Sequence, residues 1–383
     1  MLTDNKTVIK NAYLVQNSGE KILRDVLIVA GKIARIEESI DSEGCRVTNA
    51  KGNFLFPGFI DVHIQGAGGY DVLDSIDEAI PAIAKTLAVC GTTSFLSTTV
   101  VKPTVNNGHI KLANKYIGAE LDGANLLGWH LEGPYIHPEK KGGLDINSIY
   151  TYQQGGIDEI MEICGGGLKM MTIAPEMEGN LEAIKELVKN KAVASFAHST
   201  ATYEETLCGI DSGITHVTHL FNAMNPLHHR NPGPIAAIFE RKLPSQIITD
   251  GHHLNPRMIN LAKENLGSEN CVCITDGVQA LGLPEGSYVY NGKDYISKEG
   301  AAKYTDGTLI GSTTPLNVMV KKFKEWTNST LSEAINTASL NPAKVLRIDH
   351  QKGKIEIGYD ADLIITDNEL NVLHTFVGGR KVH

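Results

Sequence analysis

Apolar runs alternate with helix-like segments through the middle of the chain. A strand buried in a parallel sheet is a near-continuous hydrophobic run, whereas a surface helix repeats apolar residues every three or four positions. The predicted strands are 59–65, 93–99, 126–132, 169–174, 192–198, 216–221, 246–250 and 271–276. The predicted helices are 76–90, 110–121, 148–163, 180–189, 203–211, 234–242 and 256–265, with two more at 315–326 and 331–345.

Eight strands that alternate with helices predict an α/β fold, a (β/α)8 barrel of the TIM type. A doubly wound sheet alternates in the same way, but no predicted strand here is followed by the glycine-rich G-x-G-x-x-G loop. The two ends of the chain are different, because both consist of short alternating runs typical of half-buried strands. These runs are 8–14, 25–30, 32–36, 353–358, 362–366 and 372–377. We therefore predict a barrel at 58–348 and a small β-sandwich domain built from 1–57 and 349–383.

Composition narrows the range of partners. The 383 residues carry a net charge of −9 that is spread along the chain, without a basic block, so nucleic acid is not an expected partner. A phosphorylated metabolite stays compatible with this charge, because a few local groups suffice to hold one phosphate. The six cysteines form no CxxC pair, and no apolar stretch reaches membrane-spanning length. We expect a cytoplasmic protein with free thiols and no membrane partner.

Residues that bind metals or protons gather near the carboxyl ends of six of the eight predicted strands. Barrel enzymes hold their active sites at these ends. Glu132 closes one apolar run and is followed by Gly133 and Pro134, and a carboxylate in such a place is costly to bury without a positive partner. A structural salt bridge is the alternative explanation for Glu132 alone. The full set is Asp61, His63, Glu132, His198, His219, His252, His253 and Asp276.

Glu132, His198 and His219 form a set suited to one divalent metal ion, zinc or iron(II). Three protein ligands with one open position are the catalytic arrangement of such a site. A single buried histidine is more often a hydrogen-bonded core residue, so the prediction depends on the set. His216 lies three residues before His219 and does not share its face, and we choose His219. His63 is a candidate ligand of a partial second site.

Asp276 ends the last predicted barrel strand and precedes Gly277. Asp before Gly is common in turns, and a structural cap is one interpretation of Asp276. The other interpretation is a proton shuttle, since a carboxylate beside a metal site accepts a proton from water and passes it to a leaving group. We favour the shuttle.

These residues lie in motifs that resemble the amidohydrolase superfamily over nearly the whole chain, and within it the family of N-acetylglucosamine-6-phosphate deacetylases. The first motif marks the superfamily alone, whereas the second and fourth are far more specific. The motifs are PGFIDVH at 57–63, HLEGP at 130–134, AHS at 197–199, THLFNAM at 218–224, DGHH at 250–253, ITDG at 274–277 and LIGS at 309–312.

The resemblance implies roles for individual residues. Glu132, His198 and His219 would hold the metal, and Asp276 would be the catalytic acid and base. Arg230 and His253 would meet the 6-phosphate of an amino sugar, and a homodimer is implied because such ligands can come from the neighbouring subunit. For Arg230, a solvated polar loop is the alternative. The remaining substrate contacts implied are Gly143, Asn222, Ala223, Leu309, Ile310 and Gly311.

Two positions depart from the family pattern. Many superfamily members carry a second histidine where this chain has Gln65, and many deacetylases carry a histidine where it has Leu144. That histidine is thought to meet the acetyl carbonyl, and His137, His63 or Gln65 are candidates to replace it. We expect one firmly held metal.

The expected reaction is hydrolysis of the N-acetyl amide of N-acetylglucosamine 6-phosphate to glucosamine 6-phosphate and acetate. The alternatives are the N-acetylgalactosamine 6-phosphate epimer, another amide of the superfamily, and a non-catalytic relative that uses the fold for binding. The retained metal and acid-base residues argue against the last alternative.

Overall fold

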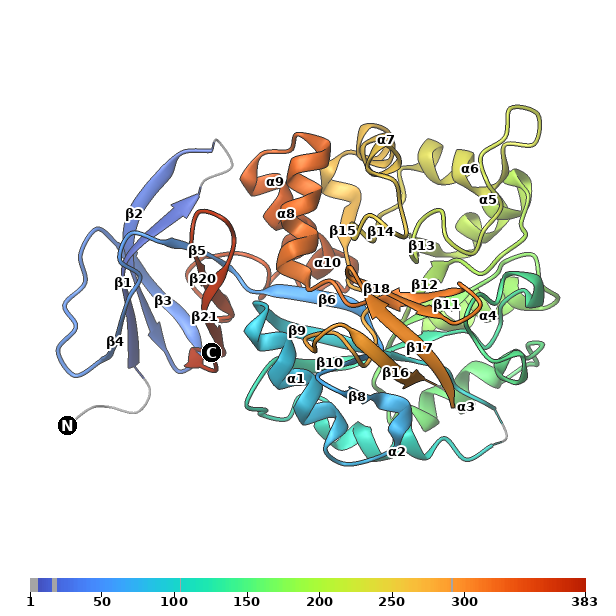
Figure 1. Ribbon diagram of the computed structural model, residues 1–383, viewed down its shortest axis with the longest axis horizontal. Helices are drawn as coiled ribbons and strands as arrows, with labels where there is room; N and C mark the ends of the chain where they lie inside the picture. The colour runs from blue at the N-terminus through green and yellow to red at the C-terminus, as the bar shows by residue number, and fades with distance from the viewer. Residues whose placement is uncertain (1–5, 16–18, 104, 291) are drawn as a thin grey trace.

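A computed structural model describes residues 6–15, 19–103, 105–290 and 292–383 of the chain. It contains a closed parallel barrel with helices around it and a separate β-sheet formed by both chain ends, which stands to the left of the barrel in Figure 1. Both parts were predicted from the sequence.

All eight predicted barrel strands are present, and each pairs in parallel with the next along the chain. A parallel bridge between Ile64 and Gly277 joins the last strand region to the first, and the Asp276 N–H donates to the His63 carbonyl at 3.0 Å. The sheet therefore closes as a barrel and not as a doubly wound sheet. The strands are β6 (Phe59–Ile64), β9 (Thr92–Thr99), β10 (Asn125–Glu132), β11 (Leu168–Ile173), β12 (Val193–Phe196), β13 (Ile214–Val217), β14 (Ser245–Ile247) and β15 (Cys271–Cys273).

Amphipathic helices cover the outside of the barrel. In α4 the buried residues Asn180, Ala183, Ile184 and Leu187 follow a helical repeat on one face. A capping box of Thr202 and Glu205 fixes the start of α5. The barrel helices are α1 (Ala79–Val89), α2 (Gly108–Ala113), α3 (Gly156–Ile163), α4 (Asn180–Lys189), α5 (Tyr203–Ser212), α6 (Gly233–Arg241) and α7 (Pro256–Leu266).

Three helices follow the last barrel strand, where two were predicted. They are α8 (Leu316–Thr327), α9 (Leu331–Thr337) and α10 (Leu340–Val345). The single predicted helix at 331–345 is wrong because the chain leaves helical geometry at Ser339. Pro342 lies in the first turn of α10, where its missing N–H costs nothing, whereas inside one continuous helix it would break a hydrogen bond. The helix predicted at 148–163 is also shorter, since α3 begins at Gly156.

The terminal sheet combines both ends of the chain in the order β22-β21-β20-β5-β1-β2-β3, with β4 paired to β1. Its apolar side chains, including Ile9, Val26, Leu363 and Phe376, form their own buried cluster. The strand predicted at 353–358 is wrong, because this segment forms turns and Gly353 and Gly358 adopt positive φ. The domain boundaries at 57/58 and 348/349 stay a prediction. The strands are β1 (Lys6–Val15), β2 (Lys21–Val29), β3 (Lys32–Glu37), β4 (Arg46–Asn49), β5 (Phe54–Pro57), β20 (Leu363–Thr366), β21 (Val372–Val377) and β22 (Arg380–Lys381).

An antiparallel sheet between β15 and α8 was not predicted. It consists of β16 (Gly286–Tyr290), β17 (Lys293–Lys298), β18 (Ala301–Tyr304) and β19 (Leu309–Ser312). The Ser312 N–H donates to the Asp276 carbonyl at 2.8 Å, so β19 is attached directly behind the last barrel strand. Tyr290 and Tyr295 pack on Val278 in a small core of their own. This sheet forms one wall of the barrel mouth.

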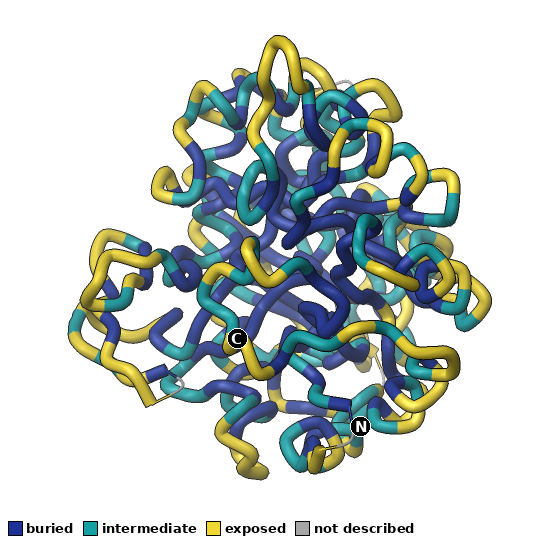
Figure 2. Tube along the Cα trace, turned by 90° about the vertical axis from the view of Figure 1, so that its right-hand side faces the viewer, coloured by how far each residue is buried: buried dark blue, intermediate teal, exposed yellow. Residues whose placement is uncertain are grey.

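Buried backbone fills the centre of the molecule and exposed loops surround it (Figure 2). Small two-residue strands and short 3-10 turns complete the mouth of the barrel, including β7 (Gly66–Ala67), β8 (Tyr70–Asp71) and η1 (Val72–Asp74). Within the described ranges, no helix combines the length and the apolar character that crossing a membrane would need.

Candidate active site

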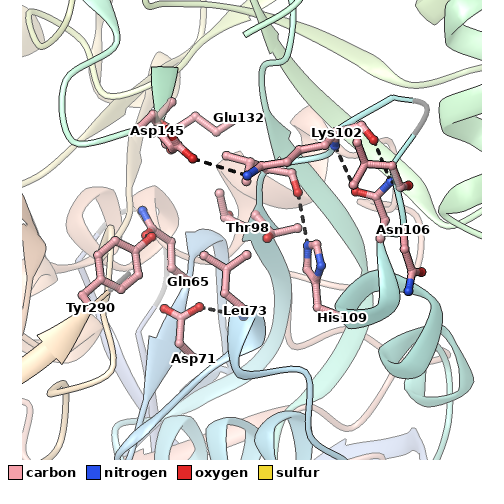
Figure 3. A pocket seen from close by; sticks show the side chains of 15 residues that line it. Gln65, Asp71, Leu73, Thr98, Lys102, Asn106, His109, Glu132, Asp145 and Tyr290 are labelled. Carbon is pink, nitrogen blue, oxygen red and sulfur yellow. Dashed lines mark hydrogen bonds and ion pairs between the residues drawn. The ribbon is translucent and has the colours of Figure 1, made fainter. Parts of the chain in front are cut away.

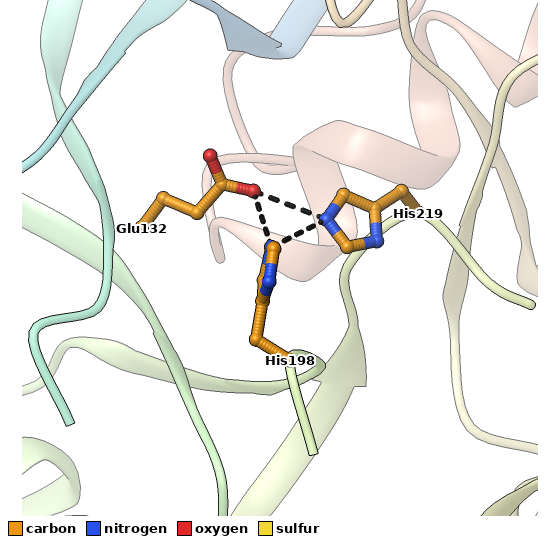
Figure 4. Close-up of side chains that lie close together, drawn as sticks. All are labelled: Glu132, His198 and His219. Carbon is orange, nitrogen blue, oxygen red and sulfur yellow. Dashed lines mark hydrogen bonds and ion pairs between the residues drawn. The ribbon is translucent and has the colours of Figure 1, made fainter. Parts of the chain in front are cut away.

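Glu132, His198 and His219 converge at the carboxyl ends of three barrel strands (Figure 4). Glu132 Oε1 lies 2.9 Å from His198 Nε2 and 3.0 Å from His219 Nε2, and the two Nε2 atoms are 3.0 Å apart. All three side chains are buried. The three residues predicted as a set from the sequence therefore present one ligand atom each to a common point.

The geometry of this cluster fits a shared cation. The Lys140 carbonyl lies 2.6 Å from His198 Nδ1 and must accept its proton, so in the neutral ring Nε2 carries a lone pair. This lone pair faces a carboxylate oxygen and a second imidazole nitrogen, and the three acceptors can be held together by a divalent ion or, in its place, by a proton shared between Nε2 and Glu132. Separations of about 3 Å are those of atoms that share one cation about 2 Å away.

The charge states agree with this arrangement. Burial raises the pKa of Glu132, but hydrogen bonds from His198 and His219 outweigh it and hold the pKa well below its usual range. Burial lowers the pKa of His219. Burial also lowers that of His198, but the hydrogen bond with Glu132 outweighs it and leaves the His198 pKa raised. Glu132 is therefore an anion, as a metal ligand must be.

The left-handed backbone places these side chains. His198, His219 and Asp276 have φ values of 50°, 29° and 47°, a region that residues other than glycine rarely adopt. Each follows a barrel strand by two or three residues, so the chain turns sharply at the strand end. Such conformations are costly and gather at functional sites.

Asp276 and His63 lie beside the cluster. His63 Nε2 is 3.2 Å from Asp276 Oδ1 and 3.9 Å from Glu132 Oε1. Its Nδ1 lies 3.0 Å from the Gln246 side-chain oxygen, which accepts the ring proton and leaves Nε2 free to face the two carboxylates. His63 therefore lies beside the cluster formed by Glu132, His198 and His219, and its role as a partial further ligand stays a prediction.

His253 is oriented by Asp250. His253 Nδ1 is 2.6 Å from Asp250 Oδ2, and its Nε2 is 3.6 Å from Asp276 Oδ2. Burial raises the pKa of Asp250, but the bond from His253 outweighs this and lowers the pKa. His253 therefore lies between two carboxylates and next to the predicted acid and base.

A cavity of about 190 Å³ opens in front of the cluster. Among the residues that line it are most of those predicted to contact substrate or metal: Glu132, Gly143, His198, His219, Asn222, Ala223, His253, Asp276, Leu309, Ile310 and Gly311. They come from seven regions of the chain.

Arg230 is not among the residues that line this cavity. It lies on an exposed loop after Met224, where its guanidinium is 2.7 Å from the His229 ring. His252 points elsewhere as well, since its Nε2 contacts the Glu299 carbonyl at 2.9 Å. His137 uses Nδ1 to accept the Glu139 N–H in a turn and does not line the cavity.

Tyr290 is a site residue that the sequence did not reveal. It comes from β16, lines the cavity and donates from its hydroxyl to Gln65 Oε1 at 2.7 Å. Gln65 in turn points its amide nitrogen toward Asp276 Oδ1 at 3.4 Å. The available signal was the polar and apolar alternation across 286–304, which predicts a hairpin but not its place over the barrel.

Several buried polar residues support the barrel and not the chemistry. His130 contacts the Val62 carbonyl and the Thr172 hydroxyl, each at 2.9 Å, and is a buried core residue. Burial raises the pKa of Asp61 to about 6, and the Thr275 hydroxyl donates to its carboxylate, which ties the first strand to the last. Burial lowers the pKa of His216 to about 3, so this ring is neutral.

Similarity to known proteins agrees with this geometry. The model of the amidohydrolase family matches residues 54–382. The N-acetylglucosamine-6-phosphate deacetylase of Lysinibacillus sphaericus is 31% identical over 376 residues, which cover 97% of each chain. The N-acetylgalactosamine-6-phosphate deacetylase of Escherichia coli O157:H7 is 33% identical over 362 residues, 92% of this chain and 93% of the relative.

Solved structures show the same fold from end to end. The N-acetylglucosamine-6-phosphate deacetylase of Pasteurella multocida superposes with a TM-score of 0.90 at 28% identity, covering 98% of this chain and 99% of the other. A mutant of the Mycobacterium smegmatis enzyme in complex with N-acetyl-D-glucosamine-6-phosphate has a TM-score of 0.89 at 26% identity and covers 99% of each chain. With the family match and the near-full-length relatives, the chain belongs to the amidohydrolase family, on the branch of the N-acetylglucosamine-6-phosphate deacetylases.

Proposed function

We propose that this protein hydrolyses the N-acetyl amide of N-acetylglucosamine 6-phosphate to glucosamine 6-phosphate and acetate. The observation that carries the proposal is the convergence of Glu132, His198 and His219 beside Asp276 in one cavity. The support from similarity is that relatives matching nearly the whole chain are named for this activity.

Glu132, His198 and His219 would hold one divalent ion, zinc or iron(II), with His63 as a partial further ligand. When such an ion is bound, it polarises the amide carbonyl and lowers the pKa of a water molecule toward ~7. The donor set of two imidazoles and a carboxylate suits both metals.

Asp276 is the proposed acid and base. Its Oδ1 lies 3.2 Å from His63 Nε2, beside the metal cluster, and the residue lines the cavity. It takes a proton from the attacking water and delivers a proton to the amine nitrogen as the C–N bond breaks. His253, oriented by Asp250, lies beside Asp276, with its Nε2 3.6 Å from Asp276 Oδ2.

Many deacetylases carry a histidine at the position of Leu144, and Gln65 is the residue that we propose takes over its role. Because Tyr290 donates to its amide oxygen, the amide NH2 is the end directed toward Asp276 and the cavity. This donor is available to the acyl oxygen, where a preorganised hydrogen bond stabilises developing negative charge.

The sugar would occupy the cavity bounded by Gly143, Asn222, Ala223 and the strand end Leu309–Gly311. Arg230 and His253 are the proposed contacts of the 6-phosphate, since a guanidinium offers paired donors to phosphate oxygens. Arg230 is exposed and lies outside this cavity, and we infer a homodimer in which such a loop meets the site of a neighbouring subunit. We also propose a cytoplasmic location.

The test measures acetate release from N-acetylglucosamine 6-phosphate by protein stripped of metal and by protein reloaded with zinc or iron(II). We expect turnover that depends on the metal and on the sugar phosphate, with the galactosamine epimer hydrolysed more slowly. Faster turnover of the epimer would reassign the substrate, which the E. coli relative makes the second candidate. No turnover by metal-loaded protein on either epimer would overturn the proposal, and a protein that binds no metal would favour the non-catalytic alternative.

A further inference from the structure

Gln246 is buried inside the barrel, on β14, and belongs to none of the motifs that predicted the site. Its side-chain amide reaches residues from three other parts of the barrel. Oε1 lies 3.0 Å from His63 Nδ1 and 3.3 Å from the His219 backbone nitrogen, and Nε2 lies 3.5 Å from Met170 Sδ. Glutamine is mostly an exposed residue in folded proteins, and two of the three contacts of this buried one are with residues of the candidate site.

The His219 backbone N–H determines which end of the Gln246 amide faces the two histidines. A backbone N–H only donates, so the atom that it meets is the amide oxygen, and the amide NH2 lies at the other end, against Met170. The same oxygen lies 3.0 Å from His63 Nδ1. Because an amide oxygen only accepts, Nδ1 is the nitrogen that carries the ring proton of His63.

The other ring nitrogen of His63 is therefore an acceptor in the neutral ring. This atom, Nε2, is buried and has no hydrogen-bond partner among the residues that the structure describes. Asp276 Oδ1 lies 3.2 Å from it and Glu132 Oε1 lies 3.9 Å from it. In this tautomer His63 donates no hydrogen bond to Asp276, and the Asp276 carboxylate keeps its lone pairs for the proton of a water molecule.

The opposite tautomer would have a different effect on the site. With its proton on Nε2, His63 would donate to Asp276 Oδ1, which already lies 3.4 Å from the Gln65 amide nitrogen. A carboxylate oxygen that accepts further hydrogen bonds is a weaker proton acceptor. An N–H directed at Asp276 and Glu132 would also oppose a cation at the cluster. The tautomer of His63 is therefore a condition for the chemistry.

Gln246 also holds the turn that carries His219. His219 has a φ of 29°, and the next residue, Leu220, donates its N–H to the Gln246 carbonyl at 2.9 Å. The side-chain oxygen of Gln246 accepts the N–H of His219 itself. One residue thus connects the backbone of a predicted metal ligand with the ring of His63, and it does so through a single oxygen atom.

We propose that Gln246 is a positioning residue, which keeps His63 in the tautomer with the proton on Nδ1 and so leaves Asp276 free to act as the base. The inference rests on the proposed function, in which Asp276 is the catalytic acid and base. Gln246 does not touch the substrate, because it is not among the residues that line the sugar cavity. It acts through His63.

The first test is nitrogen-15 NMR of the zinc-loaded protein with labelled histidine, at pH 8. The chemical shift of each ring nitrogen reports whether it carries a proton, and His63→Asn identifies the His63 signals by their absence. We expect the proton on Nδ1 in the wild type and on Nε2 in Gln246→Met, which keeps the length of the side chain but has no oxygen. Gln246→Glu retains an acceptor, and its His63 proton should stay on Nδ1.

The second test is hydrolysis of N-acetylglucosamine 6-phosphate, with kcat expressed per bound zinc. In Gln246→Met we expect kcat to fall by at least about 30-fold, because the wrong tautomer of a histidine disables the group beside it. KM should stay within about twofold, since the cavity lining is intact. Gln246→Glu should keep kcat within about fivefold of the wild type.

Thr172→Val is the matched control. Thr172 is fully buried in the same barrel, and its hydroxyl contacts the ring of His130, a core histidine, at 2.9 Å. The substitution removes a comparable buried hydrogen bond to a histidine without changing the partner of His63. We expect a lower melting temperature, kcat within about twofold of the wild type, and the His63 proton on Nδ1.

The outcomes separate this inference from the proposed function. A proton on His63 Nε2 in the wild type, alone or together with one on Nδ1, would overturn the inference, and this spectrum decides it even if Gln246→Met does not fold. A His63 proton that stays on Nδ1 in Gln246→Met would overturn it too. Equal losses of kcat in Gln246→Met and Thr172→Val would leave Gln246 only a structural role. A wild type without turnover on either epimer would overturn the proposed function, and the spectra alone would then decide whether Gln246 sets the tautomer.

Discussion

Buried carboxylates have different partners at the barrel mouth and in the terminal sheet. In the terminal sheet the buried carboxylates of Asp25 and Asp362 meet lysines: Asp25 is 2.7 Å from Lys10, and Lys352 bridges Asp362 and the partly exposed Asp360. At the mouth, Glu132 and Asp276 face histidines, and Asp71 has an unpaired oxygen. The first arrangement stabilises the fold, whereas the second leaves charge available to a cation, a proton or a ligand.

The largest expected effect comes from substituting Asp276 at the barrel mouth. Asp276→Asn removes the proton acceptor but keeps the shape of the side chain, so we expect kcat to fall by at least about 1,000-fold. Metal content after purification and substrate affinity measured by calorimetry should stay near the wild-type values, because Glu132, His198 and His219 are intact. Near-normal turnover in this variant would show that Asp276 is not the catalytic acid and base.

In the terminal sheet, the corresponding substitution is Lys352→Met, which removes an ion-pair partner. It leaves Asp362 buried without its ion-pair partner, and we expect the free energy of unfolding of this part to fall by about 3 kcal/mol in urea denaturation. The kcat of the folded enzyme should not change, since Lys352 is remote from the mouth. Lys354→Met is the matched control, because the Lys354 partner Glu356 is exposed. Equal free energies of unfolding for Lys352→Met and Lys354→Met would show that the buried ion pair contributes no more to stability than the exposed one.

Tyr290→Phe tests whether the hydrogen bond from Tyr290 to Gln65 at the barrel mouth contributes to catalysis. Without the hydroxyl, Gln65 loses the hydrogen bond that orients its amide, and we expect kcat to fall about tenfold with KM nearly unchanged. Tyr288→Phe on the same strand is the control, because its hydroxyl bonds the Pro284 carbonyl outside the cavity. A fall in KM and kcat together, or the same loss in both variants, would argue for a structural role of Tyr290.

The smallest expected effect is a pH dependence of opposite sign in the two regions. Burial raises the pKa of Asp360, but Lys32 and Lys352 outweigh it and lower the pKa, so Asp360 stabilises the fold above its unfolded pKa of about 4 and loses this as the pH falls. Burial raises the pKa of Asp71 to about 7, so its contribution is present below pH ~4 and is lost as the pH rises toward 7.

The measurement is the melting temperature of wild type minus that of Asp360→Asn, and minus that of Asp71→Asn, from pH 3.5 to 8. The first difference should rise with pH and the second should fall. Two differences of the same sign would show that the mouth and the sheet do not differ in this respect.

Most of the barrel and of the candidate site was predictable because parallel strands impose a simple rule. A buried strand is an unbroken apolar run, and the carboxyl ends of all eight strands meet at one edge. Glu132, His198, His219 and Asp276 each follow such a run, so their meeting follows from the topology. The ends of the chain were predictable as β for a similar reason, because runs such as 25–30 alternate in part with period two, although β20 is buried throughout.

What the sequence by itself determined is therefore which strands form and which polar residues end them, because hydrophobic period and strand polarity are local properties. Only the tertiary structure decided how those residues are used. The Lys140 carbonyl sets the proton position on His198, and Tyr290 arrives over Gln65 from a sheet inserted more than 200 residues later. A neighbouring cavity of about 270 Å³ (Figure 3) likewise joins Asp71, Thr99, Leu144 and Tyr290, which are separated along the chain. Contacts of this kind depend on packing between distant segments, and no local pattern carries them.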